Sequence, residues 1–131
     1  MTGLPPFLLE KNDTFQTSFK KLIKSYKSKS QQQDFIRFIS NQIESLIINP
    51  YPAQSRTEPL PGGIRLPDNL QFYKLVIVVA KGASGQIRLM YLVDKESRVI
   101  QLLLIYNHEQ FPKRPADSDL RNVLRLALEE D

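Results

Sequence analysis

Apolar residues recur along the first third of the chain at the period of an α-helix. The positions that carry this period are Phe15, Phe19, Leu22 and Tyr26, followed by Phe35, Ile39, Ile43, Leu46 and Ile47. They predict one helix over about 14–27, capped by Asn12-Asp-Thr14, and a second helix that ends at Asn49-Pro50. A short turn at Ser28-Lys-Ser30 joins them, so we predict an antiparallel pair of helices.

Three later stretches are rich in β-branched and aromatic residues and predict strands. They run over 72–79, 86–93 and 98–106, and their connectors at 81–85 and 94–97 have the length of hairpin loops. The three strands are therefore expected to form an antiparallel meander. In the middle strand Gln86 and Arg88 alternate with apolar residues, which predicts a sheet that is covered by helices on one face and partly open on the other.

The pattern also predicts elements at both ends of the chain. Phe7-Leu-Leu-Glu-Lys11 is typical of a short edge strand, and Asp117-Ser-Asp119 caps a last helix with an apolar stripe at Leu120, Val123, Leu124 and Ala127. Between 50 and 71, five prolines and Gly62-Gly63 predict a stiff excursion without regular structure. The order indicates an α+β domain over 1–131: an antiparallel sheet, made of a short N-terminal strand plus a three-stranded meander, packs against an N-terminal helical pair, with a C-terminal helix.

The amino-acid composition limits the kinds of functional site that the chain can form. The 131 residues include no cysteine and one histidine, so we expect neither a metal site nor another cofactor. The formal charge is +4, with five lysines between Lys20 and Lys29 and an acidic end, a pattern typical of a solvated helix face or of a partner-binding face. The first residues lack a basic leader and no stretch approaches 18 apolar residues, which predicts a cytoplasmic protein without membrane contact.

Five short sequences mark defined places in this order of elements: Thr14-Phe-Gln-Thr-Ser-Phe-Lys-Lys-Leu22, Leu60-Pro-Gly-Gly63, Tyr73-Lys-Leu75, Ile87-Arg-Leu-Met-Tyr91 and Leu104-Ile-Tyr-Asn-His108. In these, and in the order itself, residues 7–128 resemble the RelE/ParE toxin superfamily of bacterial type II toxin–antitoxin systems. The resemblance implies a toxin that a co-encoded antitoxin holds silent. Its target would be either messenger RNA (mRNA) on the ribosome, which it would cut, or DNA gyrase, which it would poison.

For the nuclease, the resemblance implies a site on the meander. The family often shows an aromatic-Arg-x-x-Tyr run, which Arg88 and Tyr91 match while Ile87 replaces the aromatic residue. RNA cleavage without a metal needs a base, an acid and fixed cations. Arg88 and Lys74 are the candidate cations, and His108 or Tyr106 is the candidate acid or base, since histidine ordinarily titrates near neutrality.

Each of these residues also has a structural interpretation. By alternation Tyr91 lies across the strand from Arg88 and is expected in the core. Lys74 could be a charge that protects a sheet edge, and His108 a surface residue. Lys113, Arg114 and Arg98 are candidate RNA contacts, although Lys113 and Arg114 could equally solvate a loop. The strands hold only three basic residues, Lys74, Arg88 and Arg98, which is fewer than in the most active nucleases of the superfamily.

Three functional hypotheses therefore remain open. The first is an mRNA endoribonuclease, which requires Arg88, Lys74 and His108 to converge on one cleft. The second is a gyrase-inhibiting binding toxin, which needs no acid–base group and survives the loss of His108. The third is a catalytically inert interaction module of the same fold, because function follows the site rather than the scaffold.

Overall fold

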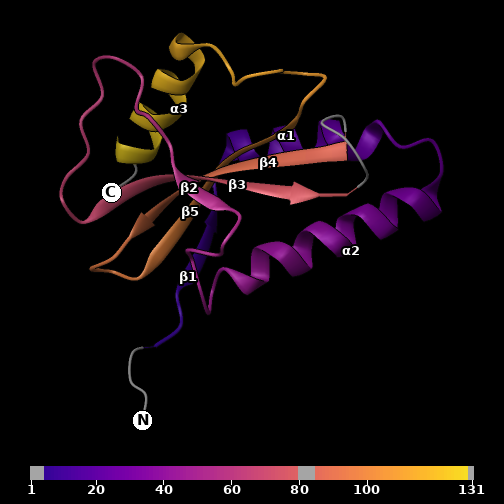
Figure 1. The fold of residues 1–131 in the computed structure, drawn as a ribbon, viewed down its shortest axis with the longest axis horizontal. Coiled ribbons are helices and arrows are strands. Elements are labelled where there is room, and N and C mark those ends of the chain that lie inside the picture. Colours follow the sequence, from indigo (N-terminus) through magenta and orange to yellow (C-terminus); the bar gives the residue numbers. More distant parts are fainter. Residues whose placement is uncertain (1–4, 80–84, 130–131) are drawn as a thin grey trace.

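Three helices and five strands make up the described part of the chain, residues 5–79 and 85–129, in the computed structural model (Figure 1). In chain order they are β1 (Leu8–Lys11), α1 (Asp13–Lys24), α2 (Lys29–Ser45), β2 (Ser55–Thr57), β3 (Leu70–Val78), β4 (Gln86–Asp94), β5 (Val99–Asn107) and α3 (Asp117–Glu129). The predicted α+β class, helical pair, meander and C-terminal helix are confirmed. The predicted hairpin loop at 81–85 falls almost wholly outside the described residues.

The strands form one five-stranded sheet in the order β1-β5-β4-β3-β2. β3, β4 and β5 are antiparallel neighbours, as predicted, but β1 runs parallel to β5, so the sheet is mixed. The side chains of a four-residue strand do not determine whether it pairs parallel or antiparallel. Its direction depends on the path that the chain takes through α1 and α2 before it returns to the sheet.

The prediction of no regular structure between 50 and 71 is wrong at one place. β2 pairs with β3 through Ser55↔Leu75, Arg56↔Lys74 and Thr57↔Tyr73. Pro52 and Pro59 flank this strand rather than interrupt it, so proline does not remove a ladder hydrogen bond. β2 covers part of the β3 edge and delivers the residue that follows it, Glu58, to the sheet.

α1 and α2 cover one face of the sheet. Their buried residues Phe15, Leu22, Phe35, Ile39 and Ile43 join strand residues that include Leu75, Leu89, Tyr91 and Ile105 in one core. Ser28 caps α2 by accepting a hydrogen bond from the backbone N–H of Gln31, whereas the Asn12 side chain makes no capping bond to α1. The helical pair thus fixes the orientation of the meander strands.

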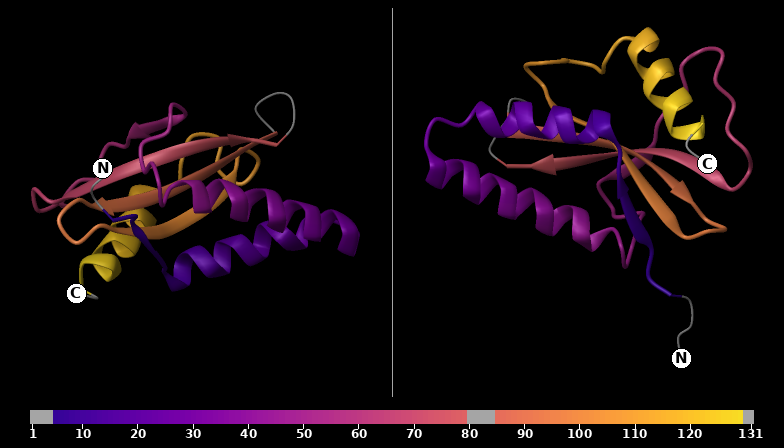
Figure 2. Two further views of the ribbon diagram at one scale, coloured as in Figure 1. Left: turned by 90° about the horizontal axis from the view of Figure 1, so that it is seen from below. Right: turned by 180° about the vertical axis from the view of Figure 1, so that it is seen from behind.

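α3 covers only part of the opposite face, where it packs on Phe72, Leu92 and Leu103 and lies apart from the helical pair (Figure 2). The proline-rich segment after β2 reaches this second face, because Ile64 and Leu66 pack against the α3 core and the Gly62 carbonyl accepts a hydrogen bond from Arg121. Among the described residues, no helix is long and apolar enough to cross a membrane.

A β-bulge in β5 sets the pairing at the open end of this face. Tyr91 pairs with Leu102 but Met90 pairs with Leu104, so Leu103 is an extra residue on β5. Without that extra residue, the register would place Ile105 opposite Arg88. With it, Tyr106 is opposite Arg88, on the face that α3 leaves partly open.

Candidate functional site

Arg88 and Tyr106 are direct cross-strand neighbours on the second face of the sheet. The Arg88 Nη2 donates a hydrogen bond to Gln86 Oε1 at 3.0 Å. The Arg88 Nη1 and the Tyr106 hydroxyl are both buried and have no hydrogen-bond partner among the described residues. Buried polar groups in proteins are nearly always paired, so two adjacent unpaired groups indicate a place where a ligand can supply the partner.

Lys74 lies on the same face, one strand away, and it is paired with a carboxylate. The Lys74 Nζ is 3.3 Å from Glu58 Oε1, and the Arg114 Nη1 is 3.0 Å from Glu58 Oε2. Arg114 also donates to the Pro59 carbonyl at 2.6 Å and to Asp117 Oδ1 at 3.0 Å. The structure therefore brings together Lys74, Arg88, Tyr106 and Arg114 from the predicted residues and adds Glu58, which the sequence patterns did not single out.

The charges around Tyr106 show how close these groups are. Burial and, less strongly, the charge of Glu58 raise the pKa of Tyr106, whereas the charges of Arg88 and Arg114 lower it, and the net result is a pKa of about 12. Although burial alone would lower the pKa of Arg114, its hydrogen bonds and its attraction to Glu58 and Asp117 raise it. At neutral pH the site therefore presents a neutral phenol, which is a hydrogen-bond donor, beside fixed cations.

His108 follows the last residue of β5 and is half-buried. Its Nδ1 is buried without a hydrogen-bond partner among the described residues. It lies two residues beyond Tyr106, at the same end of the sheet as the site, but no hydrogen bond or ion pair ties it to Arg88 or Lys74 within the described chain.

Two other predicted RNA contacts lie outside this cluster. Arg98 stands at the opposite end of β5, eight residues from Tyr106, or about 26 Å of strand at 3.3 Å per residue. There it has a left-handed φ of 58°, its Nε donates to the Pro5 carbonyl at 2.7 Å, and its guanidinium lies 4.1 Å from the centre of the Phe7 ring. These contacts hold the N-terminal strand. Lys113 is an exposed residue of the loop before α3 and, in the described chain, makes no ion pair.

Tyr91, which matches the family run, is a core residue as predicted. It is fully buried, and its hydroxyl donates to the Pro50 carbonyl at 2.8 Å. Its ring stacks on Tyr73, with centroids 5.9 Å apart. Burial raises its pKa. Tyr91 therefore anchors the segment that follows α2 to the sheet, and Tyr106 is the tyrosine of the site.

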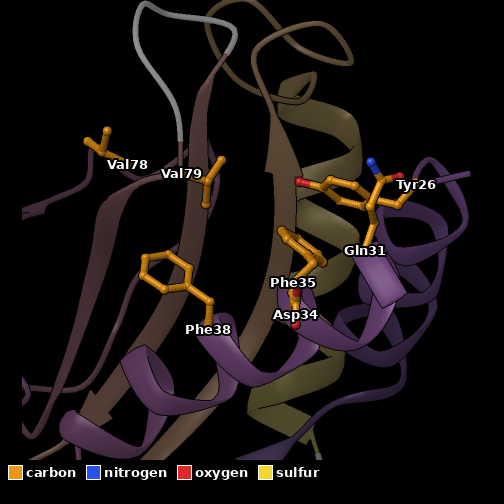
Figure 3. A pocket seen from close by; sticks show the side chains of 7 residues that line it. All are labelled: Tyr26, Gln31, Asp34, Phe35, Phe38, Val78 and Val79. Carbon is orange, nitrogen blue, oxygen red and sulfur yellow. The ribbon is translucent and has the colours of Figure 1, made fainter. Parts of the chain in front are cut away.

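Among the hollows along the sheet in the described structure, one of about 550 Å³ lies between α1 and the end of β5, and Tyr106 contributes to its lining together with Thr14, Ser18 and Phe111. The other, of about 350 Å³, lies between α2 and the end of β3. Figure 3 shows its lining, Tyr26, Gln31, Asp34, Phe35, Phe38, Val78 and Val79. It is mainly apolar and contains none of the predicted site residues.

The exposed large apolar residues lie mostly outside the meander. Phe38 and Ile36 are on α2, Leu8 is on β1, and Val78, with 59% of its surface exposed, is on β3. By alternation and register, Val78 lies on the same face of the sheet as Lys74 and Arg88, so the partly open face holds an exposed apolar residue as well as charged groups.

Comparison with solved structures yields chains of similar fold at low sequence identity. One is a chain of the archaeal RelE–RelB complex from Pyrococcus horikoshii OT3, which is 16% identical in sequence. The superposition covers 78% of this chain and 94% of that chain, with a TM-score of 0.46. A mutant of the E. coli toxin RelE in the free state is 13% identical, with 82% and 88% covered and a TM-score of 0.49. A conserved hypothetical protein from Helicobacter pylori is 14% identical, with 79% and 97% covered and a TM-score of 0.39.

Two of these chains carry the name RelE, which is part of the name of the superfamily that the sequence resembles. No protein-family model and no curated protein matches the sequence. At these identities and TM-scores the function has to be argued from the residues of this chain.

Proposed function

We propose that this chain is the toxin of a type II toxin–antitoxin system and acts as a ribosome-dependent, metal-independent mRNA endoribonuclease. The observation that carries the proposal is the Arg88–Tyr106 pair, in which each side chain holds a buried polar atom without a partner. Both atoms are hydrogen-bond donors at neutral pH, so a ligand group that pairs with them is a hydrogen-bond acceptor. A phosphodiester of RNA is an acceptor that also carries the negative charge that Arg88 attracts.

Each residue then has a role in transfer of the phosphoryl group to the 2′-oxygen. Arg88, with Lys74 beside it, stabilises the charge that accumulates on the phosphorane. The neutral Tyr106 phenol gives a proton to the leaving 5′-oxygen as the bond between phosphorus and that oxygen breaks, because its high pKa keeps it protonated near neutral pH. His108 takes the proton of the 2′-hydroxyl. Arg114, which shares Glu58 with Lys74, contacts the same phosphate, whereas Lys113 and Arg98 contact RNA phosphates farther from the cleaved bond.

The proposal includes two partners and a location. A co-encoded antitoxin neutralises the chain, as the RelB of the archaeal complex accompanies its RelE. Messenger RNA on the ribosome is the substrate, and the cytoplasm is where the two meet. The apolar hollow beside Phe38 and Val78 suits an apolar segment of the antitoxin, away from the charged site.

The test is induced expression in bacteria of the wild type, Arg88→Ala and His108→Ala, with growth and the integrity of translated messages scored together. We expect growth arrest with cut messages from the wild type and relief by either substitution. Arg37→Ala is the matched control, because this arginine is 71% exposed on α2 and pairs only with Asp34 within the described chain. Relief by Arg37→Ala as well would show that loss of any arginine suffices, and would refute the assigned site.

One observation favours the alternative of a gyrase-inhibiting, ParE-like binding toxin, or the second alternative of an inert interaction module. Two of the five cations assigned to the site or to RNA phosphates, Lys74 and Arg114, are held by Glu58 in the free chain. Growth arrest without message cutting, unchanged by His108→Ala, would support the gyrase target. Absence of arrest would support the interaction module.

A further inference from the structure

Glu58 lies where an anionic ligand of this site would lie. Its side chain is 6% exposed, and each carboxylate oxygen contacts a different cation, Oε1 the Lys74 ammonium at 3.3 Å and Oε2 the Arg114 guanidinium at 3.0 Å. Lys74 and Arg114 are 25% and 22% exposed, so both reach solvent more than the carboxylate between them does. A buried anion bridging two partly hydrated cations is the arrangement that a bound phosphate would have.

The same place has more donors than acceptors. Besides the two cations, the Arg88 Nη1 and the Tyr106 hydroxyl are buried without partners in the described chain, and the Tyr106 hydroxyl is near enough to Glu58, Arg88 and Arg114 for their charges to act on it. A carboxylate has two oxygens, and both are engaged. A phosphate has more oxygens and greater charge, so it can engage donors that Glu58 leaves unpaired.

The backbone of Glu58 is held in the sheet by hydrogen bonds that do not involve its side chain. Its N–H donates to the Phe72 carbonyl at 2.8 Å, which continues the β2–β3 pairing by one residue. The next carbonyl, that of Pro59, accepts from Arg114 at 2.6 Å. The strand pairing is therefore independent of the carboxylate, and a rotation of the Glu58 side chain would uncover both cations without moving the sheet.

We propose that Lys74 and Arg114, with Arg88 and Tyr106 beside them, form a phosphate-binding site that the protein's own Glu58 carboxylate occupies in the free chain. Glu58 is thus the residue that sets the affinity of the site for phosphate, because an incoming phosphate and the carboxylate compete for the same two cations. The identification of that phosphate as part of RNA rests on the proposed function. Competition itself depends only on the four side chains and Glu58.

The experiment is a calorimetric titration of the folded full-length chain with inorganic phosphate at low ionic strength. Glu58→Gln keeps the shape of the side chain and removes its charge, and we expect it to bind phosphate at least tenfold more tightly than the wild type. Adding Lys74→Met to Glu58→Gln should abolish that gain. Asp117→Asn is the matched control: it removes one negative charge from the same arginine at a side chain that is 54% exposed, so we expect less than a twofold change.

Equal affinity of wild type and Glu58→Gln would overturn the inference, and so would an equal gain from Asp117→Asn, because that would be an effect of net charge. If Glu58→Gln fails to fold, Glu58→Asp carries the test. The carboxylate is then one methylene shorter and withdraws from both cations, so affinity should rise at least threefold; an unchanged affinity would refute the competition.

The outcome is separable from that of the proposed function. Tighter phosphate binding by Glu58→Gln in a chain that cuts no messages would keep this inference and refute the nuclease. Message cutting by the wild type together with no effect of Glu58→Gln on phosphate affinity would refute the inference and keep the nuclease.

Discussion

The two buried tyrosines of the meander should respond in opposite ways to the loss of a hydroxyl. Tyr91 and Tyr106 are 0% and 1% exposed, and both lie on the β4–β5 pair. The Tyr91 hydroxyl donates to the buried Pro50 carbonyl at 2.8 Å, whereas the Tyr106 hydroxyl has no partner in the described chain. Substitution by phenylalanine removes one oxygen in each case and leaves the packed ring.

The expected magnitudes follow from the hydrogen bonds. Tyr91→Phe removes a buried hydrogen bond and leaves a buried carbonyl unsatisfied, which lowers the free energy of unfolding by about 2 kcal/mol. Tyr106→Phe removes a buried hydroxyl that no protein group satisfies, so the free energy of unfolding should stay the same or rise by up to about 1 kcal/mol. The two variants should therefore differ in their free energy of unfolding by about 2–3 kcal/mol.

Urea unfolding followed by circular dichroism measures both free energies, and an unchanged m-value shows that the same transition is compared. Growth inhibition by the same variants separates stability from function. The Tyr91→Phe variant should remain toxic to the extent that it is folded. The Tyr106→Phe variant should lose its toxicity although it is at least as stable as the wild type. A Tyr106→Phe variant that unfolds more easily than Tyr91→Phe would refute the reasoning, since it would mean that the Tyr106 hydroxyl is satisfied by the fold.

Two further predictions concern the framework that holds the site. Ser18 Oγ accepts the Ile105 N–H at 3.1 Å and so ties α1 to β5; Ser18→Ala should lower the free energy of unfolding in urea by about 1–2 kcal/mol, while the exposed neighbour Thr17→Ala should change it little. Burial would raise the pKa of Asp94, but hydrogen bonds from the Asn69 side chain and from the following turn outweigh it and lower that pKa. The stabilisation is therefore present above the ordinary carboxylate pKa and lost as pH falls through the folded value. Accordingly Asp94→Asn should destabilise the chain at pH 7, with a difference from the wild type that shrinks in urea titrations below about pH 4; a difference that is constant from pH 7 to pH 3 would contradict this assignment.

The periodic parts of the chain were predictable because the spacing of their apolar residues shows which side chains are buried. The stripes of α1 and α2 and the β3–β5 meander follow directly from apolar spacing, and alternation correctly places Tyr91 in the core. β2 was not predictable in this way, because its three residues include one buried side chain and their pairing with β3 depends on a partner far along the sequence. A proline-rich segment and a short strand are compatible when the prolines lie at the ends of the strand.

The site was predictable only in part, because its geometry depends on one irregularity and one long-range contact. Sequence reasoning found Arg88, Lys74, Tyr106 and Arg114 by residue type and by resemblance. The bulge that places Tyr106 opposite Arg88 has no local signature in a run of five apolar residues, Leu102 to Tyr106. Glu58 gave one weak signal, an acidic residue alone among prolines, and its role depends on Lys74 and Arg114, which are 16 and 56 positions away.

The electrostatics of the cluster show why the count of basic residues on the strands is a poor measure of its capacity to bind RNA. Lys74 and Arg114 are committed to Glu58, and Arg114 also to Asp117, so in the free chain the cation with an unpaired donor is Arg88. A phosphate that displaces the Glu58 carboxylate would gain three cations, while one that leaves it in place would gain Arg88 alone and be repelled by the carboxylate. Displacement of the Glu58 carboxylate costs free energy. A larger ligand, such as structured RNA held by the ribosome, can offset this cost with binding energy from additional contacts, whereas a short free RNA makes no such additional contacts. If the proposed competition holds, we therefore expect a short free RNA to bind this chain more weakly than an RNA held by a larger partner, because Glu58 has to be displaced in either case.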